Sequence, residues 1–131
     1  MPEFYSPAVI EHCRHPRNAG RLPSGDPDVA GGEAGAAAEG DLVRIQIRVG
    51  PDHVVREAAF KAFGCPATIA AASLATERVL GQSLACAVEF AARDLAQALS
   101  LSPDRAHSAE LARGALAAAV EAFRRKRGLD S

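Results

Sequence analysis

The residues best suited to chemistry are one thiol, one imidazole and two carboxylates, namely Cys65, His107, Asp41 and Glu39. Cys65 is the most informative of them, because an alternating apolar stretch ends there and a helix is expected to begin at Pro66. A thiol in that position faces the amide N–H groups of the first helical turn, which favour its thiolate form. The thiolate is the form that binds metals and attacks sulfur. Cys65 is therefore predicted to be a metal ligand or a sulfur acceptor.

Together the four side chains offer carboxylate oxygen, imidazole nitrogen and thiolate sulfur. This mixed set suits a single Zn²⁺ or Fe²⁺, since both ions accept all three ligand types. A [2Fe–2S] cluster is a poorer match, because clusters are held mainly by thiolates and this set contains only one. A cluster shared by a homodimer through two copies of Cys65 is the remaining arrangement. A single iron or zinc ion is therefore the cofactor that Asp41, Cys65, His107 and Glu39 would suit if the fold brings them together.

Each of these residues also has a purely structural interpretation. Cys65 can be a small buried apolar residue, and Asp41 can end the turn before a strand. His107 falls in the first turn of a predicted helix, where the helix dipole keeps its imidazole neutral and available for ligation. It can equally be an ordinary surface side chain, and Glu39 can be a solvated loop carboxylate. The residue types alone leave both interpretations open.

The other two cysteines, Cys13 and Cys86, are expected to be structural, because both fall in apolar helical stretches. The three cysteines are widely spaced, and none forms a C-x-x-C pair. This argues against a disulfide framework and excludes a structural zinc site made of neighbouring thiols. Any metal ligands must therefore come together from distant segments. His12 and His15 lack a third ligand nearby and are expected to lie on the surface.

The composition of the chain is that of a globular protein. The chain has 131 residues, 48% of them hydrophobic and 24% charged, which is ordinary for a globular protein, and we expect one domain over 1–131. A net charge of -1 gives no electrostatic reason to expect nucleic acid or an anionic membrane as partner. No apolar run reaches membrane-spanning length and no signal peptide is recognisable, so we expect a cytoplasmic location.

The N-terminal third predicts one helix and a long loop. Ser6 caps the helix, the following proline suits its first turn, and the helix stops before Pro16. Residues 17–40 are rich in Gly, Pro, Asp and Ala and are predicted to be mostly loop. A short strand is expected near Val29 or at 33–37. A loop this long in a small domain is more often functional than idle.

A hairpin follows. Residues 42–49 alternate apolar and polar side chains, the pattern of a strand with one buried face. The Gly-Pro-Asp-His sequence at 50–53 is typical of a turn, and 54–63 returns as the partner strand. These segments predict an antiparallel sheet with one solvent-exposed face.

The second half of the chain is helical. Helices are predicted at 66–80, from Ser83 to Phe90, around 95–99, and from Ser102-Pro103 to the basic residues at 124–127. Strands followed by helices without regular alternation indicate an α+β fold, a small antiparallel sheet packed on one face by helices.

Several motifs occur in one order along nearly the whole chain: HPRNAG at 15–20, GDLVRIQIRV at 40–49, FKAFGC at 60–65, IAAASLATE at 69–77 and GQSL at 81–84. In sequence and order they resemble the IscU/NifU N-terminal family of iron–sulfur cluster assembly scaffolds. The resemblance implies the IscU/SufE-like sandwich fold. It also implies site residues at Asp41, Cys65 and His107, and a cysteine desulfurase as the partner that supplies sulfur.

The chain departs from the family pattern at three places. The family has a cysteine where Glu39 stands, and the cysteine that receives sulfur in the family is replaced by Ser108. The family's chaperone-docking motif L-P-P-V-K reads LSPDR at 101–105, which argues against recognition by an Hsp70-type chaperone. The resemblance therefore implies a scaffold that diverges at its metal site.

Three functions are consistent with these residues. The preferred one is an iron–sulfur assembly scaffold, not an enzyme in its own right, that holds iron or zinc and meets a desulfurase. The second is a SufE-like acceptor in which Cys65 takes persulfide sulfur without metal. The third is a metal-free paralogue that keeps the scaffold surface as a binding or regulatory module.

Overall fold

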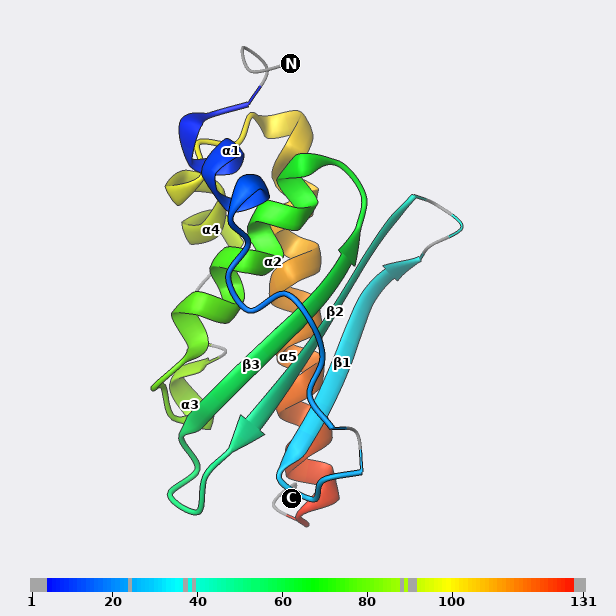
Figure 1. The fold of residues 1–131 in the computed structure, drawn as a ribbon, viewed down its shortest axis with the longest axis vertical. Helices are drawn as coiled ribbons and strands as arrows, with labels where there is room; N and C mark the ends of the chain where they lie inside the picture. Colours follow the sequence, from blue (N-terminus) through cyan, green and yellow to red (C-terminus); the bar gives the residue numbers. More distant parts are fainter. Residues whose placement is uncertain are drawn as a thin grey trace.

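The computed structural model describes residues 5–23, 25–36, 38, 40–87, 89 and 92–128. Its centre is a three-stranded antiparallel sheet in the order β1-β2-β3, whose strands are Val29–Ala36, Asp41–Val49 and Val55–Phe63. Helices cover one face of the sheet and leave the other largely open (Figure 1). The expected α+β architecture is therefore confirmed.

The central strand β2 packs one of its faces against the helices. Its alternate side chains are buried and at most 2% exposed: Val43, Ile45, Ile47 and Val49. The side chains between them point to the open face, as the period of two predicts. A hydrogen bond from the Gly50 N–H to the Val54 carbonyl closes the turn that leads into β3. The expected hairpin is confirmed.

The helices lie close to the predicted positions. They are α1 (Pro7–Arg14), α2 (Pro66–Val79), α3 (Leu84–Ala87), α4 (Ala92–Ala98) and α5 (Ala106–Lys126), with a 3₁₀ turn at Pro103–Arg105. Ser6 caps α1 as predicted, since its Oγ accepts a hydrogen bond from the Val9 N–H at 3.1 Å. The last α-helix begins at Ala106 rather than at Pro103. Phe90, the expected end of the third helix, lies outside the described residues.

Two of these helices pack directly against the covered face of the sheet. Helix α5 packs under β1 and β2, and α2 packs under β3 (Figure 1). The largest buried side chains of α5 are Leu116, Val120 and Phe123. Helix α2 contributes mainly alanines, which let it pack close to both the sheet and α5. No helix within the described ranges is long and apolar enough to cross a membrane.

Strand β1 departs from the sequence-based expectation. The composition of 17–40 predicts mostly loop, yet β1 pairs with β2 along its whole length. Glycine usually weakens a strand, but Gly32 has a packing role. A Cβ built there would lie 2.4 Å from the Ala119 nitrogen and 2.6 Å from the Ala115 oxygen of α5. The strand forms because this close helix–sheet contact, which has no local sequence signal, outweighs the low strand propensity of its residues.

Helix α1 is tied to α2 through a buried histidine. The sequence places His12 on the surface, but the structure corrects this: it is only 8% exposed, and its Nδ1 lies 2.8 Å from the Ser73 Oγ. The same oxygen accepts a hydrogen bond from the Arg17 N–H at 2.8 Å. Burial, followed by the nearby charge of Arg17, lowers the pKa of the His12 imidazole. His12 therefore has a structural role and stays neutral.

Candidate functional site

Three distant segments meet at one end of the sheet. Register pairs Leu42 with Phe63, so the start of β2 lies beside the end of β3. Asp41 is the first residue of β2, and Cys65 lies at the N-cap position of α2 just beyond β3. The first turn of α5, which carries His107, packs beside this N-terminus. The topology therefore brings Asp41, Cys65 and His107 to one end of the sheet.

Gly64 makes the close approach of these segments possible. Its φ angle is +146°, a value that L side chains rarely adopt. A Cβ at this position would lie 2.3 Å from Oδ1 of Asp41. The glycine before Cys65 is therefore required by both backbone conformation and space.

Asp41 is the centre of the site. Its Oδ2 lies 3.3 Å from Nε2 of His107, and its Oδ1 accepts a hydrogen bond from the Thr68 hydroxyl at 3.1 Å. The carboxylate side chain is 28% exposed and the imidazole 54% exposed. A carboxylate and an imidazole thus stand together at the surface, where an incoming ion can reach both.

Thr68 connects Asp41 with Cys65 and is a site residue that the sequence analysis missed. It is fully buried, and its hydroxyl lies 2.9 Å from the Ser108 hydroxyl and 3.6 Å from the Cys65 sulfur. Ser108 is also fully buried, with its hydroxyl 3.9 Å from the same sulfur. The sequence did contain a signal for Thr68: it follows Cys65 by three residues, and residues three apart on a helix are neighbours on its surface.

The hydroxyls of Thr68 and Ser108 have one proton each to donate. The Cys65 sulfur and the Asp41 carboxylate are the two acceptors that carry negative charge when ionised. Two protons are thus shared among three kinds of contact: the one to the Asp41 carboxylate, those to the Cys65 sulfur, and the one between the two hydroxyls.

The environment of Cys65 favours its thiolate. Partial burial alone would raise the pKa of the thiol. The hydroxyls of Thr68 and Ser108 near the sulfur, together with the backbone N–H groups of the first turn of α2, outweigh this, and the net effect is a lowered pKa. The side chain stays partly accessible. Cys65 therefore combines accessibility with a stabilised anion, as reactive and metal-binding cysteines do.

Replacing Thr68 with valine should raise the pKa of Cys65, because the substitution keeps the shape of the side chain and removes a hydroxyl that supports the thiolate. The pH profile of alkylation by iodoacetamide follows the thiolate fraction, so its midpoint should move to higher pH. Thr76→Val is the matched control, since Thr76 is buried on the same helix and its hydroxyl bonds the Ser73 carbonyl instead. Equal midpoints for wild type and Thr68→Val would show that the hydroxyl does not stabilise the thiolate.

The other cysteines lie outside this arrangement. Cys13 is partly buried, and its Sγ donates to the Pro66 carbonyl at 3.3 Å, in line with a structural role. Burial, with a smaller contribution from the charge of Cys65, raises its pKa. Cys86 is exposed, so it does not pack as its apolar surroundings in the sequence predict.

The donor types fit a single metal ion better than a cluster. Asp41 and His107 are in contact, and Cys65 adjoins Asp41 through the Thr68 hydroxyl. Within the described ranges, however, no three His, Cys, Asp or Glu side chains lie close enough together to hold an ion as they stand. Glu39, the remaining predicted ligand, lies outside the described residues. Binding through all three donors therefore requires side-chain movement, for which His107 has room at the surface.

Comparison with known proteins identifies the family of this chain. The family described as the NifU-like N terminal domain matches residues 4–130. The chain is 42% identical over 125 residues to the iron–sulfur cluster assembly scaffold protein IscU of Azotobacter vinelandii, covering 95% of this chain and 98% of the relative. It is 40% identical over 123 residues to IscU of Escherichia coli strain K12, and the match covers 94% of this chain and 96% of that relative.

The fold is shared with solved structures at lower sequence identity. A nitrogen-fixing NifU-like protein (N-terminal) from Brucella abortus superposes with a TM-score of 0.65 at 20% identity, covering 94% of each chain. The relatives above are named as scaffold proteins rather than as catalysts. With a match across nearly its entire length, the chain belongs to the NifU-like N-terminal domain family.

Proposed function

We propose that this protein is an iron–sulfur cluster assembly scaffold whose metal site has diverged. The observation that carries the proposal is the contact between Asp41 and His107, with Cys65 joined to both through Thr68, at the place where the family sequence motifs converge. Over nearly the whole chain, relatives that share about two residues in five are named scaffolds of this kind. The proposed site takes iron as cargo.

Asp41, Cys65 and His107 are the proposed ligands of one Fe²⁺ or Zn²⁺ ion, with Glu39 as a fourth. Carboxylate, thiolate and imidazole are all accepted by these ions. Because Ser108 offers a hydroxyl in place of a thiolate, one chain has too few sulfur ligands at this site for a standard [2Fe–2S] cluster. A cluster would then need thiolates from two chains, which makes a homodimer the form in which assembly is completed.

A cysteine desulfurase is the proposed sulfur donor. In this step the Cys65 thiolate attacks the outer sulfur of a persulfide on the desulfurase. A new S–S bond forms on Cys65, the S–S bond of the donor breaks, and the donor cysteine leaves as a thiolate. The lowered pKa of Cys65 and its partial exposure favour this role, so a SufE-like sulfur acceptor is the second candidate.

Metal analysis of untagged protein tests the scaffold proposal. We expect about one iron or zinc ion per chain in wild type and a sharp loss in both Cys65→Ala and His107→Ala, because each removes one of three ligands. Cys86→Ala is the matched control, since Cys86 is an exposed thiol away from these ligands. A wild-type protein that stays free of metal after anaerobic iron loading would exclude the metal site.

Persulfide labelling separates the remaining candidates. A metal-free protein whose Cys65 takes labelled sulfur from a desulfurase would be a sulfur acceptor. A protein that binds the desulfurase equally well as wild type and as Cys65→Ala, without metal or sulfur uptake, would be a binding module.

A further inference from the structure

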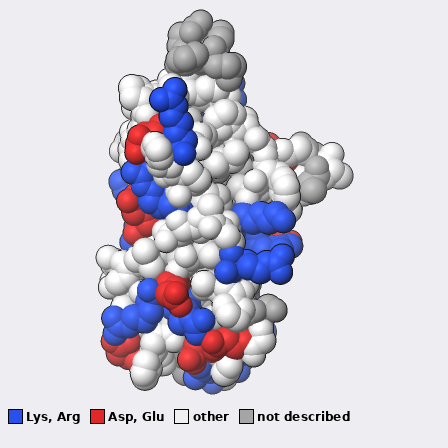
Figure 2. Space-filling view, viewed as in Figure 1, with Lys and Arg blue, Asp and Glu red and all other residues white. Residues whose placement is uncertain are grey.

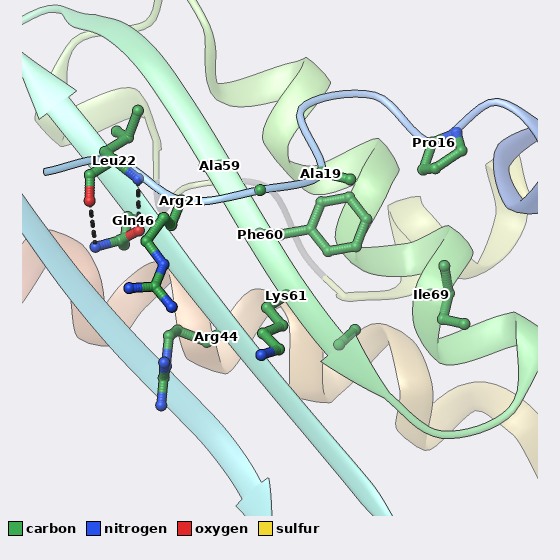
Figure 3. Close-up of a pocket in the computed structure, with 12 residues that line it drawn as sticks. Pro16, Ala19, Arg21, Leu22, Arg44, Gln46, Ala59, Phe60, Lys61 and Ile69 are labelled. Carbon is green, nitrogen blue, oxygen red and sulfur yellow. Dashed lines mark hydrogen bonds between the residues drawn. The ribbon is translucent and has the colours of Figure 1, made fainter.

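A hollow lies on the open face of the sheet, and it is lined by other residues than Asp41, Cys65 and His107. It is open to solvent and has a volume of about 640 Å³, which is within the usual range for small-molecule sites. One side of it is apolar and is formed by Pro16, Ala19, Phe60 and Ile69 (Figure 3). The hollow approaches the candidate site at Ile69, whose N–H bonds the Cys65 carbonyl.

The opposite side of this hollow is cationic. Arg21, Arg44 and Lys61 line it together and come from three different segments (Figure 3). The space-filling view shows Lys and Arg side chains gathered on this face over the strands (Figure 2). The chain as a whole carries a net charge of -1, so this concentration of positive charge is local.

Most of this positive charge is uncompensated. Arg44 pairs with Glu33, with its Nε 2.6 Å from the carboxylate. Arg21 and Lys61 form no ion pair with the part of the chain that the structure describes, and the Lys61 ammonium instead lies 5.4 Å from the centre of the Phe63 ring. Like charges repel one another, and a multiply charged anion between them would relieve that repulsion.

The wall of the hollow is held in place without a ligand. Gln46 on β2 accepts the Leu22 N–H at 2.8 Å and donates to the Leu22 carbonyl at 3.3 Å (Figure 3). Along the edge of β3, the Phe60 N–H donates to the Asn18 carbonyl at 2.9 Å, and the Gly20 N–H donates to the Phe60 carbonyl at 3.0 Å. Because the segment that carries Arg21 is fixed at both sides, binding requires little ordering of the backbone.

We propose that this hollow is a binding site for a small organic anion that has a flat or apolar body and a phosphate or carboxylate group. The apolar body packs against Phe60 and Ile69, and the anionic group lies among Arg21, Arg44 and Lys61. None of the proposed metal ligands lines this hollow, so binding of the anion does not depend on whether the protein holds iron.

Titration of the isotope-labelled full chain with 1-naphthyl phosphate tests the proposal by backbone amide chemical shifts. The shifts should cluster on residues 19–22, 44–46 and 59–62, and the affinity should fall as salt is added. Inorganic phosphate lacks the apolar body and naphthalene-1-methanol lacks the charge, so each should bind at least about tenfold more weakly, a difference of about 1.4 kcal/mol.

Charge variants locate the anionic group. Arg21→Glu and Lys61→Glu should each weaken binding by at least about tenfold, because a charge-assisted contact becomes a repulsion. Arg56→Glu is the matched control: Arg56 is an exposed arginine on β3 outside the hollow, and it should change the affinity less than about twofold. Glu33→Gln should tighten binding, since it releases Arg44 from its ion pair.

Three results would overturn the proposal. Inorganic phosphate binding as tightly as naphthyl phosphate would reduce the site to a surface charge effect. Equal losses in Arg56→Glu and Arg21→Glu would place binding elsewhere. A Glu-rich peptide containing phenylalanine that binds the same residues more tightly than naphthyl phosphate would make the occupant a protein segment instead of a small molecule.

Discussion

Replacing Gly32 with alanine is expected to destabilise the fold by about 3 kcal/mol or more, because the new methyl group has no space. Its Cβ would lie 2.4 Å from the nitrogen of Ala119 and 2.6 Å from the oxygen of Ala115. These are backbone atoms of a helix and cannot rotate away, so α5 would have to move off β1. Such a loss is large compared with the total stability of a small domain, about 5–15 kcal/mol. Urea unfolding followed by circular dichroism measures it.

Gly31→Ala is the matched control for this prediction. Gly31 precedes Gly32 in the same strand but faces the open side, where a Cβ would be 3.3 Å from the Gln46 side chain. That side chain can adjust, and alanine restricts the unfolded chain, so the free energy of unfolding should change by less than about 1 kcal/mol. Equal effects of the two substitutions would mean that helix packing is not what requires glycine at 32.

Replacing Gly64 with alanine is the second large effect, and it should disrupt the candidate site itself. A Cβ there would lie 2.3 Å from the Asp41 carboxylate oxygen, at a φ angle of +146°. The strained backbone should cost about 1–3 kcal/mol. In addition, the carboxylate has to turn away from Thr68, which separates Asp41 from Cys65. We expect metal affinity to fall at least about tenfold and the Asp41–Thr68 hydrogen bond to be lost, as followed by metal titration and by the amide shifts of both residues.

Gly40→Ala separates backbone strain from the loss of the site. Gly40 also has a positive φ, +92°, and precedes Asp41, but a Cβ there would meet nothing within 4 Å. This variant should lose stability while keeping the metal affinity and the Asp41–Thr68 hydrogen bond. If it loses metal as completely as Gly64→Ala, then the carboxylate collision is not the cause.

The regular elements could be predicted from the sequence because their signals are local. The alternation along β2, the Ser6 cap of α1 and the Pro66 start of α2 each depend on a few neighbouring residues. Strand β1 could not be predicted in full, since its small residues have little strand propensity and it is formed by contacts with β2 and α5. His12 was misplaced for the same reason, because its partner Ser73 is distant in the sequence.

The sequence by itself determined the fold class, the family and the candidate donors Asp41, Cys65 and His107, because these depend on residue type and order. Only the tertiary structure decided how the donors are connected. It places Thr68 and Ser108 as buried hydroxyls between the Asp41 carboxylate and the Cys65 sulfur, which brings the pKa of the thiol down. Hydrogen bonds between groups distant in the chain depend on strand register and helix packing, and no local pattern of residues specifies either.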